Sequence, residues 1–214
     1  MTSSVETGRT AVLIDFGGVV TTSVLSAFRS IGAEVGDAEL PLTLLSRDEA
    51  SRTLLSDYEC GRICTDAFEE CFARRRRVHG AQVEADGLAA RMQANLARDE
   101  ETIELLDGLR SAGVPVALVS NAFGRDTYAG FDLGALADVV IISSEVGIRK
   151  PSRRIYRIAC DRLGIEPESA VMVDDLQQNL DGAARLGIAG VLHSDGAGTA
   201  RELHDRFGLP ALRR

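Results

Sequence analysis

Short aliphatic runs alternate regularly with longer amphipathic segments through the second half of the chain, and this alternation limits the fold more than any other feature. The aliphatic runs are typical of strands covered on both faces by helices, and they occupy residues 114–120, 139–143, 170–174 and 188–192. Amphipathic segments that predict helices occupy residues 101–112, 153–163 and 176–186, and a shorter one follows Gly124. Glycine and serine at residues 194–199 predict a surface loop before a C-terminal helix. This order predicts an α/β fold with a doubly wound, parallel, Rossmann-like sheet.

The first strand-like run is separated from the next by a long helical stretch. Residues 12–20 begin as an aliphatic strand that ends in Asp15 and a glycine turn. Apolar residues then recur at helical spacing, as they do around Phe68. An insertion of roughly 80 residues is far too long to be an ordinary connection. We therefore predict two parts, a core and an all-helical insertion, which occupy residues 1–20 with 101–214 and residues 21–100, respectively.

Reactive side chains stand where the strand runs end. The first run ends in Asp15, the run at 114–120 ends in Ser120 and Asn121, and the run at 170–174 ends in Asp174 and Asp175. Because the carboxyl ends of parallel strands meet at one edge of a sheet, we expect these side chains to lie close together. Lys150, the only lysine among 24 basic residues, stands in Gly-Ile-Arg-Lys-Pro and is expected at the same edge.

Taken in order, these four segments resemble the four motifs of the haloacid dehalogenase-like (HAD) superfamily. The resemblance spans residues 11–193, and each motif is carried by residues of this chain: Asp15, Ser120 with Asn121, Lys150, and Asp174 with Asp175. It implies that residues 21–100 form the helical cap that many members carry in this gap. Within the superfamily, the chain most resembles the phosphatase-like amino-terminal domain of soluble epoxide hydrolase and its bacterial relatives.

The resemblance implies phosphoryl transfer through an aspartyl-phosphate. Asp15 would be the nucleophile, and Lys150 would offset the negative charge of the phosphoryl group. Ser120 and the backbone N–H of Asn121 would bind the transferred phosphoryl oxygens. These roles predict a small, phosphorylated substrate.

The resemblance also implies a Mg²⁺ cofactor, because oxygen-only ligands suit this ion. Asp15 and Asp175 would be side-chain ligands, and Asp174 would be either a ligand or the holder of a coordinated water. The backbone carbonyl of Gly17 would complete the protein ligands, and Asn179 would steady the metal's water shell.

Gly17 departs from the family pattern, because family phosphatases usually carry a second aspartate at this position as the general acid. Its loss removes assistance typically worth about 10²–10⁴ in rate. The substitution predicts slow turnover on alkyl phosphates and a smaller effect with good leaving groups.

Two other functions stay open. A degenerate member could serve as a binding or regulatory module that keeps Mg²⁺ and phosphate recognition without turnover. A 2-haloacid dehalogenase needs no aspartate at position 17, but it does not need Mg²⁺ either, and Asp174-Asp175 resembles an intact metal pair. Phosphonate cleavage, which uses an additional cap lysine as a Schiff base, is disfavoured because Lys150 is the only lysine.

Composition excludes some partners. The net charge of −8 argues against nucleic acid or an anionic membrane. Neither a signal peptide nor a membrane span is evident, which predicts a cytoplasmic protein, either monomeric or homodimeric. The run Arg74 to Arg77 is interpreted as a solvated helix face, with a substrate-attracting surface as the alternative.

Other polar residues carry weaker signals. Substrate specificity would come from the cap, where Tyr58, Glu59, Arg62 and the arginine run are the candidates. The spacing of Cys60, Cys64 and Cys71 predicts one face of a helix, with reduced core thiols favoured over a metal site. The remaining candidates, predicted to be structural or surface residues, are His79, His193 and His204.

Overall fold

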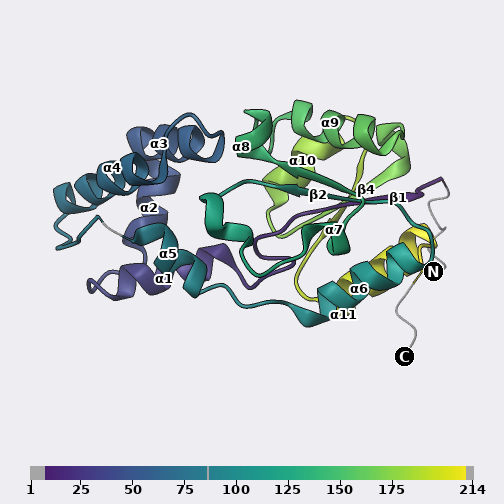
Figure 1. The fold of residues 1–214 in the computed structure, drawn as a ribbon, viewed down its shortest axis with the longest axis horizontal. Coiled ribbons are helices and arrows are strands. Elements are labelled where there is room, and N and C mark those ends of the chain that lie inside the picture. Colours follow the sequence, from purple (N-terminus) through teal and green to yellow (C-terminus); the bar gives the residue numbers. More distant parts are fainter. Residues whose placement is uncertain (1–7, 86, 211–214) are drawn as a thin grey trace.

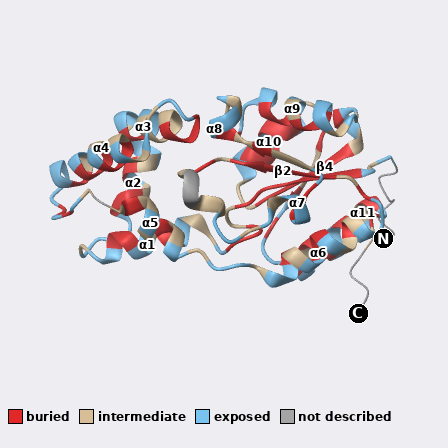
Figure 2. Ribbon diagram, viewed as in Figure 1, coloured by how far each residue is buried: buried red, intermediate tan, exposed pale blue. Residues whose placement is uncertain are grey.

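A five-stranded parallel sheet forms the centre of the core, in the order β3-β2-β1-β4-β5, in a computed structural model that describes residues 8–85 and 87–210. The strands are β1 (Ala11–Ile14), β2 (Val116–Ser120), β3 (Val139–Ile142), β4 (Ala170–Asp174) and β5 (Ala189–Leu192). Every residue of β1, β2 and β4 is buried, as expected for strands with helices on both faces (Figure 2). The predicted α/β class and parallel sheet are confirmed.

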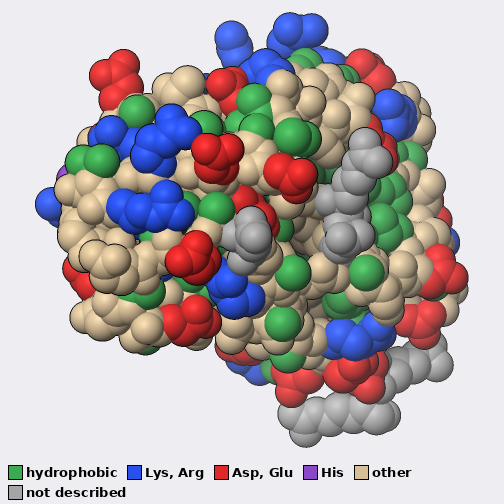
Figure 3. Space-filling model, turned by 60° about the vertical axis from the view of Figure 1, so that its left-hand side comes forward, with side chains coloured by type: hydrophobic (Ala, Val, Ile, Leu, Met, Phe, Trp, Pro, Cys, Tyr) green, Lys and Arg blue, Asp and Glu red, His purple; other side chains and the backbone are tan. Residues whose placement is uncertain are grey.

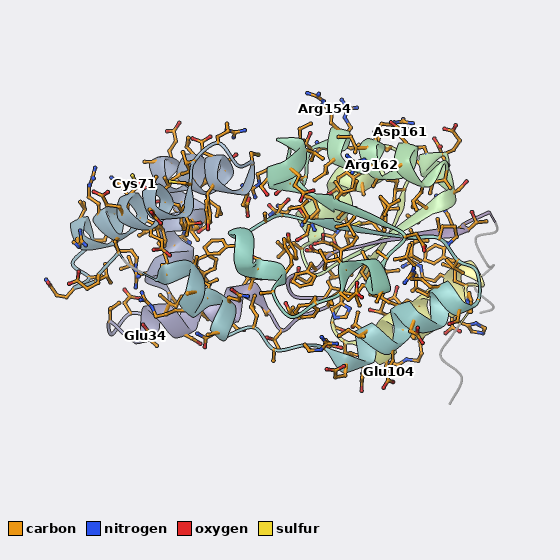
Figure 4. The ribbon with its side chains drawn as sticks, in the orientation of Figure 1. Glu34, Cys71, Glu104, Arg154, Asp161 and Arg162 are labelled. Atoms are coloured by element: carbon orange, nitrogen blue, oxygen red, sulfur yellow. The ribbon has the colours of Figure 1, made fainter. Side chains whose placement is uncertain are left out.

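Helices cover both faces of the sheet (Figure 1). One layer contains α6 (Glu100–Ser111), α7 (Leu133–Leu136) and α11 (Gly196–Phe207). The other contains α8 (Ser143–Val146), α9 (Arg153–Leu163) and α10 (Gln177–Ala184). Two separate apolar clusters fill the spaces between these layers and the sheet. Glu104 of α6 and Arg154 of α9 are both exposed and lie on opposite outer sides of the core (Figure 4).

The prediction of a surface loop at residues 194–199 was wrong, because α11 begins at Gly196. Asp195 caps this helix, and its Oδ1 accepts a hydrogen bond from the N–H of Gly198 at 2.6 Å. A Cβ added to Gly196 would lie 2.7 Å from the Cβ of Glu101, so glycine permits close packing of α11 on α6. Gly196 allows α11 to pack closely on α6, whereas the sequence pattern had predicted a loop at this position.

Other element boundaries shift by one or two residues. The predicted strand at 139–143 ends at Ile142, because Ser143 begins α8. Likewise, β2 begins at Val116 and α10 ends at Ala184, each inside its predicted range. Two 3₁₀ turns complete the core, at Arg125–Tyr128 and Pro167–Ser169.

The regular elements of the insertion are all helices in its described residues, as predicted. Its helices are α1 (Val24–Ala33), α2 (Leu40–Arg47), α3 (Glu49–Glu59), α4 (Thr65–Val78) and α5 (Leu88–Ala94). They enclose an apolar cluster of their own, in which Tyr58 and Phe68 stack with ring centroids 4.3 Å apart. No described helix has both the length and the apolar character needed to cross a membrane.

Two backbone hydrogen bonds pair the segments through which the chain enters and leaves the insertion. The N–H of Thr22 donates to the carbonyl of Ala97 at 2.8 Å, and the N–H of Asp99 donates to the carbonyl of Val20 at 2.9 Å. These contacts lie near residues 20 and 100, and the predicted division into core and cap stays a prediction. Residues 1–7, 86 and 211–214 of the predicted core and cap lie outside the described residues.

The arginine run is only partly solvated, so the prediction of a solvated helix face was wrong for Arg76. Its side chain is buried, and Nη2 donates to the carbonyl of Ile31 at 3.3 Å. Arg75 pairs with Asp48 at 2.5 Å, whereas Arg74 is exposed. Acidic side chains lie among the basic ones where the cap end comes forward in Figure 3. The run therefore mainly supports the cap's own packing.

The cysteines do not share one helix face, contrary to the prediction. Cys60 follows α3 and Cys64 precedes α4, while Cys71 lies within α4 (Figure 4). All four thiols, including that of Cys160 in α9, are free. The spacing of Cys60 and Cys64 matched that of a helix, but the two residues lie on either side of the turn between α3 and α4.

Candidate active site

Three carboxylates meet at the carboxyl edge of the sheet. Asp15 directly follows β1 and is anchored there, because its N–H donates to the carbonyl of Val173 at 3.0 Å. Asp174 is the last residue of β4, and Asp175 follows it. One carboxylate oxygen from each lies within 4.8 Å of the others. The pairing of β1 with β4 therefore brings together residues far apart in the sequence.

Lys150 lies buried between two of these carboxylates. Its Nζ is 2.6 Å from Oδ1 of Asp15 and 2.8 Å from Oδ2 of Asp174. Asn121 holds the backbone of this lysine: the Lys150 N–H donates to Oδ1 of Asn121 at 2.8 Å, and Nδ2 of Asn121 donates to the Lys150 carbonyl at 3.3 Å. The second and third predicted motifs are therefore joined by hydrogen bonds.

Asn179 acts directly on Asp174. Its Nδ2 donates to Oδ1 of Asp174 at 2.8 Å, and the same oxygen accepts the N–H of Leu176 at 2.9 Å. Because Lys150 occupies Oδ2, both oxygens of Asp174 have partners and the carboxylate is fixed in orientation. Asn179 was predicted to steady a metal's water shell, and its observed contact is with a predicted ligand.

The cluster carries more negative charge than its single ammonium group can balance. Burial raises the pKa of Asp15 and outweighs the opposing effect of Lys150. Burial and the neighbouring Asp174 raise the pKa of Asp175 to about 6. Burial alone would lower the pKa of Lys150, but Asp15 and Asp174 outweigh it, so the pKa is raised and the group stays cationic. A further positive charge would relieve this site.

The oxygen-only donor set fits Mg²⁺, which prefers carboxylate and carbonyl ligands. Gly18 lets Asp175 approach the loop after β1: its φ is +87°, and an added Cβ would overlap the Asp175 carboxylate. Gly17 has no such backbone requirement, but an added Cβ there would lie 2.6 Å from Cγ2 of Val24. Val24 therefore occupies the space into which a side chain at position 17 would extend.

Ser120 has a partner that the sequence analysis missed. The hydroxyl of Tyr128 donates to Oγ of Ser120 at 2.8 Å. Burial raises the pKa of Tyr128, so the hydroxyl keeps its proton. Its ring packs edge-on against Phe16, with centroids 4.9 Å apart. A tyrosine in the 3₁₀ turn after the second motif gave no signal of this contact in the sequence.

A cavity of about 70 Å³ lies between the cap and this edge of the core. The core contributes Gly17, Ser120 and Asn121 to its lining. Most of the cap side is apolar and includes Val24 and Phe28. The cap therefore faces Gly17, Ser120 and Asn121 across this cavity.

Glu59 is the acidic residue of the cap that lines this cavity. It is 9% exposed, and its Oε2 lies 2.7 Å from Nε of Arg149. That Nε–H donates instead to the Lys150 carbonyl at 3.1 Å, and no described residue donates a hydrogen bond to Oε2 of Glu59. Burial raises the pKa of Glu59 to about 7, although Arg149 and Lys150 oppose the change.

The other predicted cap residues lie elsewhere. Tyr58 and Arg62 line a separate cleft of about 820 Å³ between the cap and the core. Arg62 pairs with Asp57 at 2.7 Å. His193 is buried, and its Nδ1 lies 2.9 Å from Oγ1 of Thr199, which agrees with the predicted structural role.

Comparisons with known proteins agree with this fold. Over 194 residues the chain is 29% identical to (S)-2-haloacid dehalogenase 4A of Burkholderia cepacia, with 86% of this chain and 81% of that protein covered. Over 86 residues it is 37% identical to phosphoserine phosphatase of Thermus thermophilus, with 38% and 34% covered. Over 107 residues it is 32% identical to bifunctional epoxide hydrolase 2 of Rattus norvegicus, covering 47% of this chain and 19% of that protein.

A solved structure has the same fold. It is a HAD family enzyme of Bacteroides thetaiotaomicron in complex with magnesium and inorganic phosphate, with a TM-score of 0.61, 22% identity, and coverage of 88% of this chain and 96% of that one. The profile of haloacid dehalogenase-like hydrolases matches residues 10–187. The chain therefore belongs to the haloacid dehalogenase-like hydrolase family.

Proposed function

We propose that this chain is a Mg²⁺-dependent phosphatase-like hydrolase that transfers a phosphoryl group from a small substrate to Asp15. The observation that carries this proposal is the cluster of three carboxylates within 4.8 Å, beside a single buried lysine. A dehalogenase that attacks carbon has no need for this excess of negative charge, whereas a divalent cation would balance it. The phosphatase relative and the magnesium and phosphate complex of the structural neighbour support the same choice.

Asp15 is oriented for nucleophilic attack. Its Oδ1 accepts hydrogen bonds from the N–H of Phe16 and lies against Nζ of Lys150, both at 2.6 Å. No described residue donates to Oδ2, so this oxygen forms the new bond to phosphorus as the bond to the leaving oxygen breaks. Water then attacks the phosphorus, which releases phosphate and restores the carboxylate.

The remaining residues bind and orient the phosphoryl group. The Oγ of Ser120 and the N–H of Asn121 bind its oxygens, while Lys150 offsets its charge. Mg²⁺, when held by Asp15, Asp175 and the Gly17 carbonyl, with Asp174 as a ligand or through water, supplies further charge neutralisation. No side chain at position 17 assists the leaving group, so a proton donor for poor leaving groups has to lie elsewhere in the site.

A 2-haloacid dehalogenase is the second candidate, because the dehalogenase relative is 29% identical over 86% of this chain. The apolar cap side of the cavity would also suit a short haloalkanoate. A binding module without turnover is the third candidate, and Gly17 is the residue that favours it.

The test compares phosphate release from an aryl and an acyl phosphate, with and without Mg²⁺, and chloride release from (S)-2-chloropropionate. We expect Mg²⁺-dependent phosphate release that is lost in Asp15→Asn and kept in Asp161→Asn, an exposed carboxylate on α9. Chloride release without Mg²⁺ would replace the proposal with the dehalogenase. Mg²⁺ binding with neither activity would favour the binding module.

A further inference from the structure

The leaving oxygen needs a proton, and the loop after β1 cannot supply it. Gly17 has no side chain, and Cγ2 of Val24 would lie only 2.6 Å from a Cβ at that position. The core therefore lacks an acid at position 17 and also the space for one. The cap side of the cavity, in contrast, carries a carboxyl group, that of Glu59.

Glu59 is anchored at the boundary between cap and core. It ends α3, and its backbone carbonyl accepts a hydrogen bond from Oγ of Ser143 at 2.5 Å. The same Oγ accepts the N–H of Ala122 at 2.9 Å, one residue after Asn121. A buried serine therefore ties Glu59 to the segment that carries the predicted phosphoryl-binding groups.

The carboxyl group of Glu59 is available for proton exchange. It lines the same cavity as Gly17 and Ser120, and no described residue donates a hydrogen bond to its Oε2. Its Oε2 lies 2.7 Å from Nε of Arg149, which makes an ion pair without a hydrogen bond. A pKa raised to about 7 by burial makes both the acid and the carboxylate accessible near neutral pH.

We propose that Glu59 is the general acid and base of this hydrolase, supplied by the cap in place of a side chain at position 17. This inference rests on the proposed phosphatase function. As Oδ2 of Asp15 bonds to phosphorus, the bond to the leaving oxygen breaks and that oxygen takes the proton of Glu59. The Glu59 carboxylate then takes a proton from a water molecule as the oxygen of that water attacks phosphorus. This attack breaks the bond to Asp15 and releases phosphate.

The cavity also limits the leaving group. A cavity of about 70 Å³ whose cap side is mostly apolar, with Glu59 and Gln93 as the polar exceptions, suits a short aliphatic alcohol. The substrate class is therefore a small alkyl phosphate, which is the class that depends most on a proton donor.

The test compares propyl phosphate with 4-nitrophenyl phosphate, whose leaving group departs without a proton. We expect Glu59→Gln to lower kcat/KM for propyl phosphate by about 10²-fold or more. The rapid first release of nitrophenolate should change by less than about 3-fold, followed by slower steady turnover, because only the second step then lacks its base. Glu59→Asp should recover part of the propyl phosphate activity.

Two controls separate this role from a structural one. Asp57→Asn removes a carboxylate on the same helix that pairs with Arg62, and it should leave both activities unchanged. Arg149→Gln removes the ion-pair partner of Glu59 and should not reproduce the difference between the two substrates.

Equal losses on both substrates in Glu59→Gln, matched by Arg149→Gln, would overturn the inference and leave the proposed function intact. Failure of Glu59→Asp to recover any activity would also overturn it. A wild-type protein that acts on neither substrate would instead end the proposed function, and the inference with it.

Discussion

Two parts of the candidate site are built differently: the charged cluster at the sheet edge, here called the core wall, and the cap side of the cavity, here called the cap wall. On the core wall, Asp174 has partners on both carboxylate oxygens, and Lys150 is held by two carboxylates and by Asn121. On the cap wall, the side chains are mostly apolar, and Glu59 has an ion pair but no hydrogen bond to its Oε2. The charged groups of the core wall are each fixed by several partners, whereas the Glu59 carboxylate is held by one ion pair.

The largest effect should follow from breaking the core wall at Lys150. Lys150→Met leaves two buried carboxylates without their cation, which should lower the free energy of unfolding by about 3–5 kcal/mol. Phosphatase activity should fall by at least about 10²–10³-fold, because the phosphoryl charge loses its protein cation. Urea unfolding and kcat/KM with 4-nitrophenyl phosphate measure the two losses.

Arg154→Met provides the matched control, because it removes an exposed cation from α9. We expect it to change stability by less than about 0.5 kcal/mol. A Lys150→Met protein as stable as this control would show that the buried carboxylates do not need the lysine.

The cap wall should show the next largest effect, in the pH dependence of stability. The pKa of Glu59 is about 7 in the folded protein and 4.5 in the unfolded chain. The folded state therefore holds the proton more tightly, and stability falls as pH rises from 4.5 through 7. The interval between the two pKa values corresponds to roughly 3 kcal/mol. Glu59→Gln lacks this pH-dependent loss, so its free energy of unfolding should rise relative to that of wild type over this pH range.

Urea unfolding of wild type and Glu59→Gln at pH 4, 6 and 8 measures this gain. Asp15 and Asp175 also titrate, but they are present in both proteins and cancel in the difference. A difference that stays constant from pH 4 to pH 8 would mean that the pKa of Glu59 is the same in the folded and unfolded states.

A third prediction concerns Gly17, where the two walls meet. Gly17→Asp forces a side chain against Val24 and should lower the free energy of unfolding by about 1–3 kcal/mol. Adding Val24→Ala makes room, so the double variant should hydrolyse propyl phosphate faster than Val24→Ala alone. Unfolding curves and kcat/KM of the two single variants and the double variant test this. Equal rates in Val24→Ala and the double variant would show that an aspartate at position 17 cannot reach the leaving oxygen.

The core wall could be predicted from the sequence because it depends on where strands end. Parallel pairing of β1 with β4 places Asp15 beside Asp174 whatever the details of packing. The contact between Asn121 and the backbone of Lys150 could not be predicted, because it depends on the path of a loop between two elements.

The cap wall was harder to predict because it depends on docking between separate modules. Glu59 stood among several polar candidates in the sequence, and only its burial against the core sets it apart from Arg62. Gly196 was wrongly predicted to lie in a loop for a related reason: glycine commonly marks a loop, but here it permits close contact between α11 and α6. Helix packing distances have no local sequence signature.

The smallest effect should come from changing Tyr128, which contacts Ser120 at the margin of the core wall. Tyr128→Phe removes the hydroxyl that donates to Oγ of Ser120 at 2.8 Å but keeps the ring against Phe16. The lost hydrogen bond should cost about 1 kcal/mol of stability. Because Ser120 Oγ then rotates more freely, inhibition by inorganic phosphate should weaken by roughly 3–10-fold.

Tyr156→Phe is the matched control, since it also removes a buried hydroxyl, one that donates to the carbonyl of Asn179 at 2.8 Å. Both variants should lose similar stability in urea, because each loses one buried hydrogen bond. Only Tyr128→Phe should weaken phosphate inhibition, because only its partner is a predicted phosphoryl-binding group. Equal inhibition in the two variants would mean that Ser120 is oriented without Tyr128, and that the core wall's hydrogen-bonded network ends at Ser120.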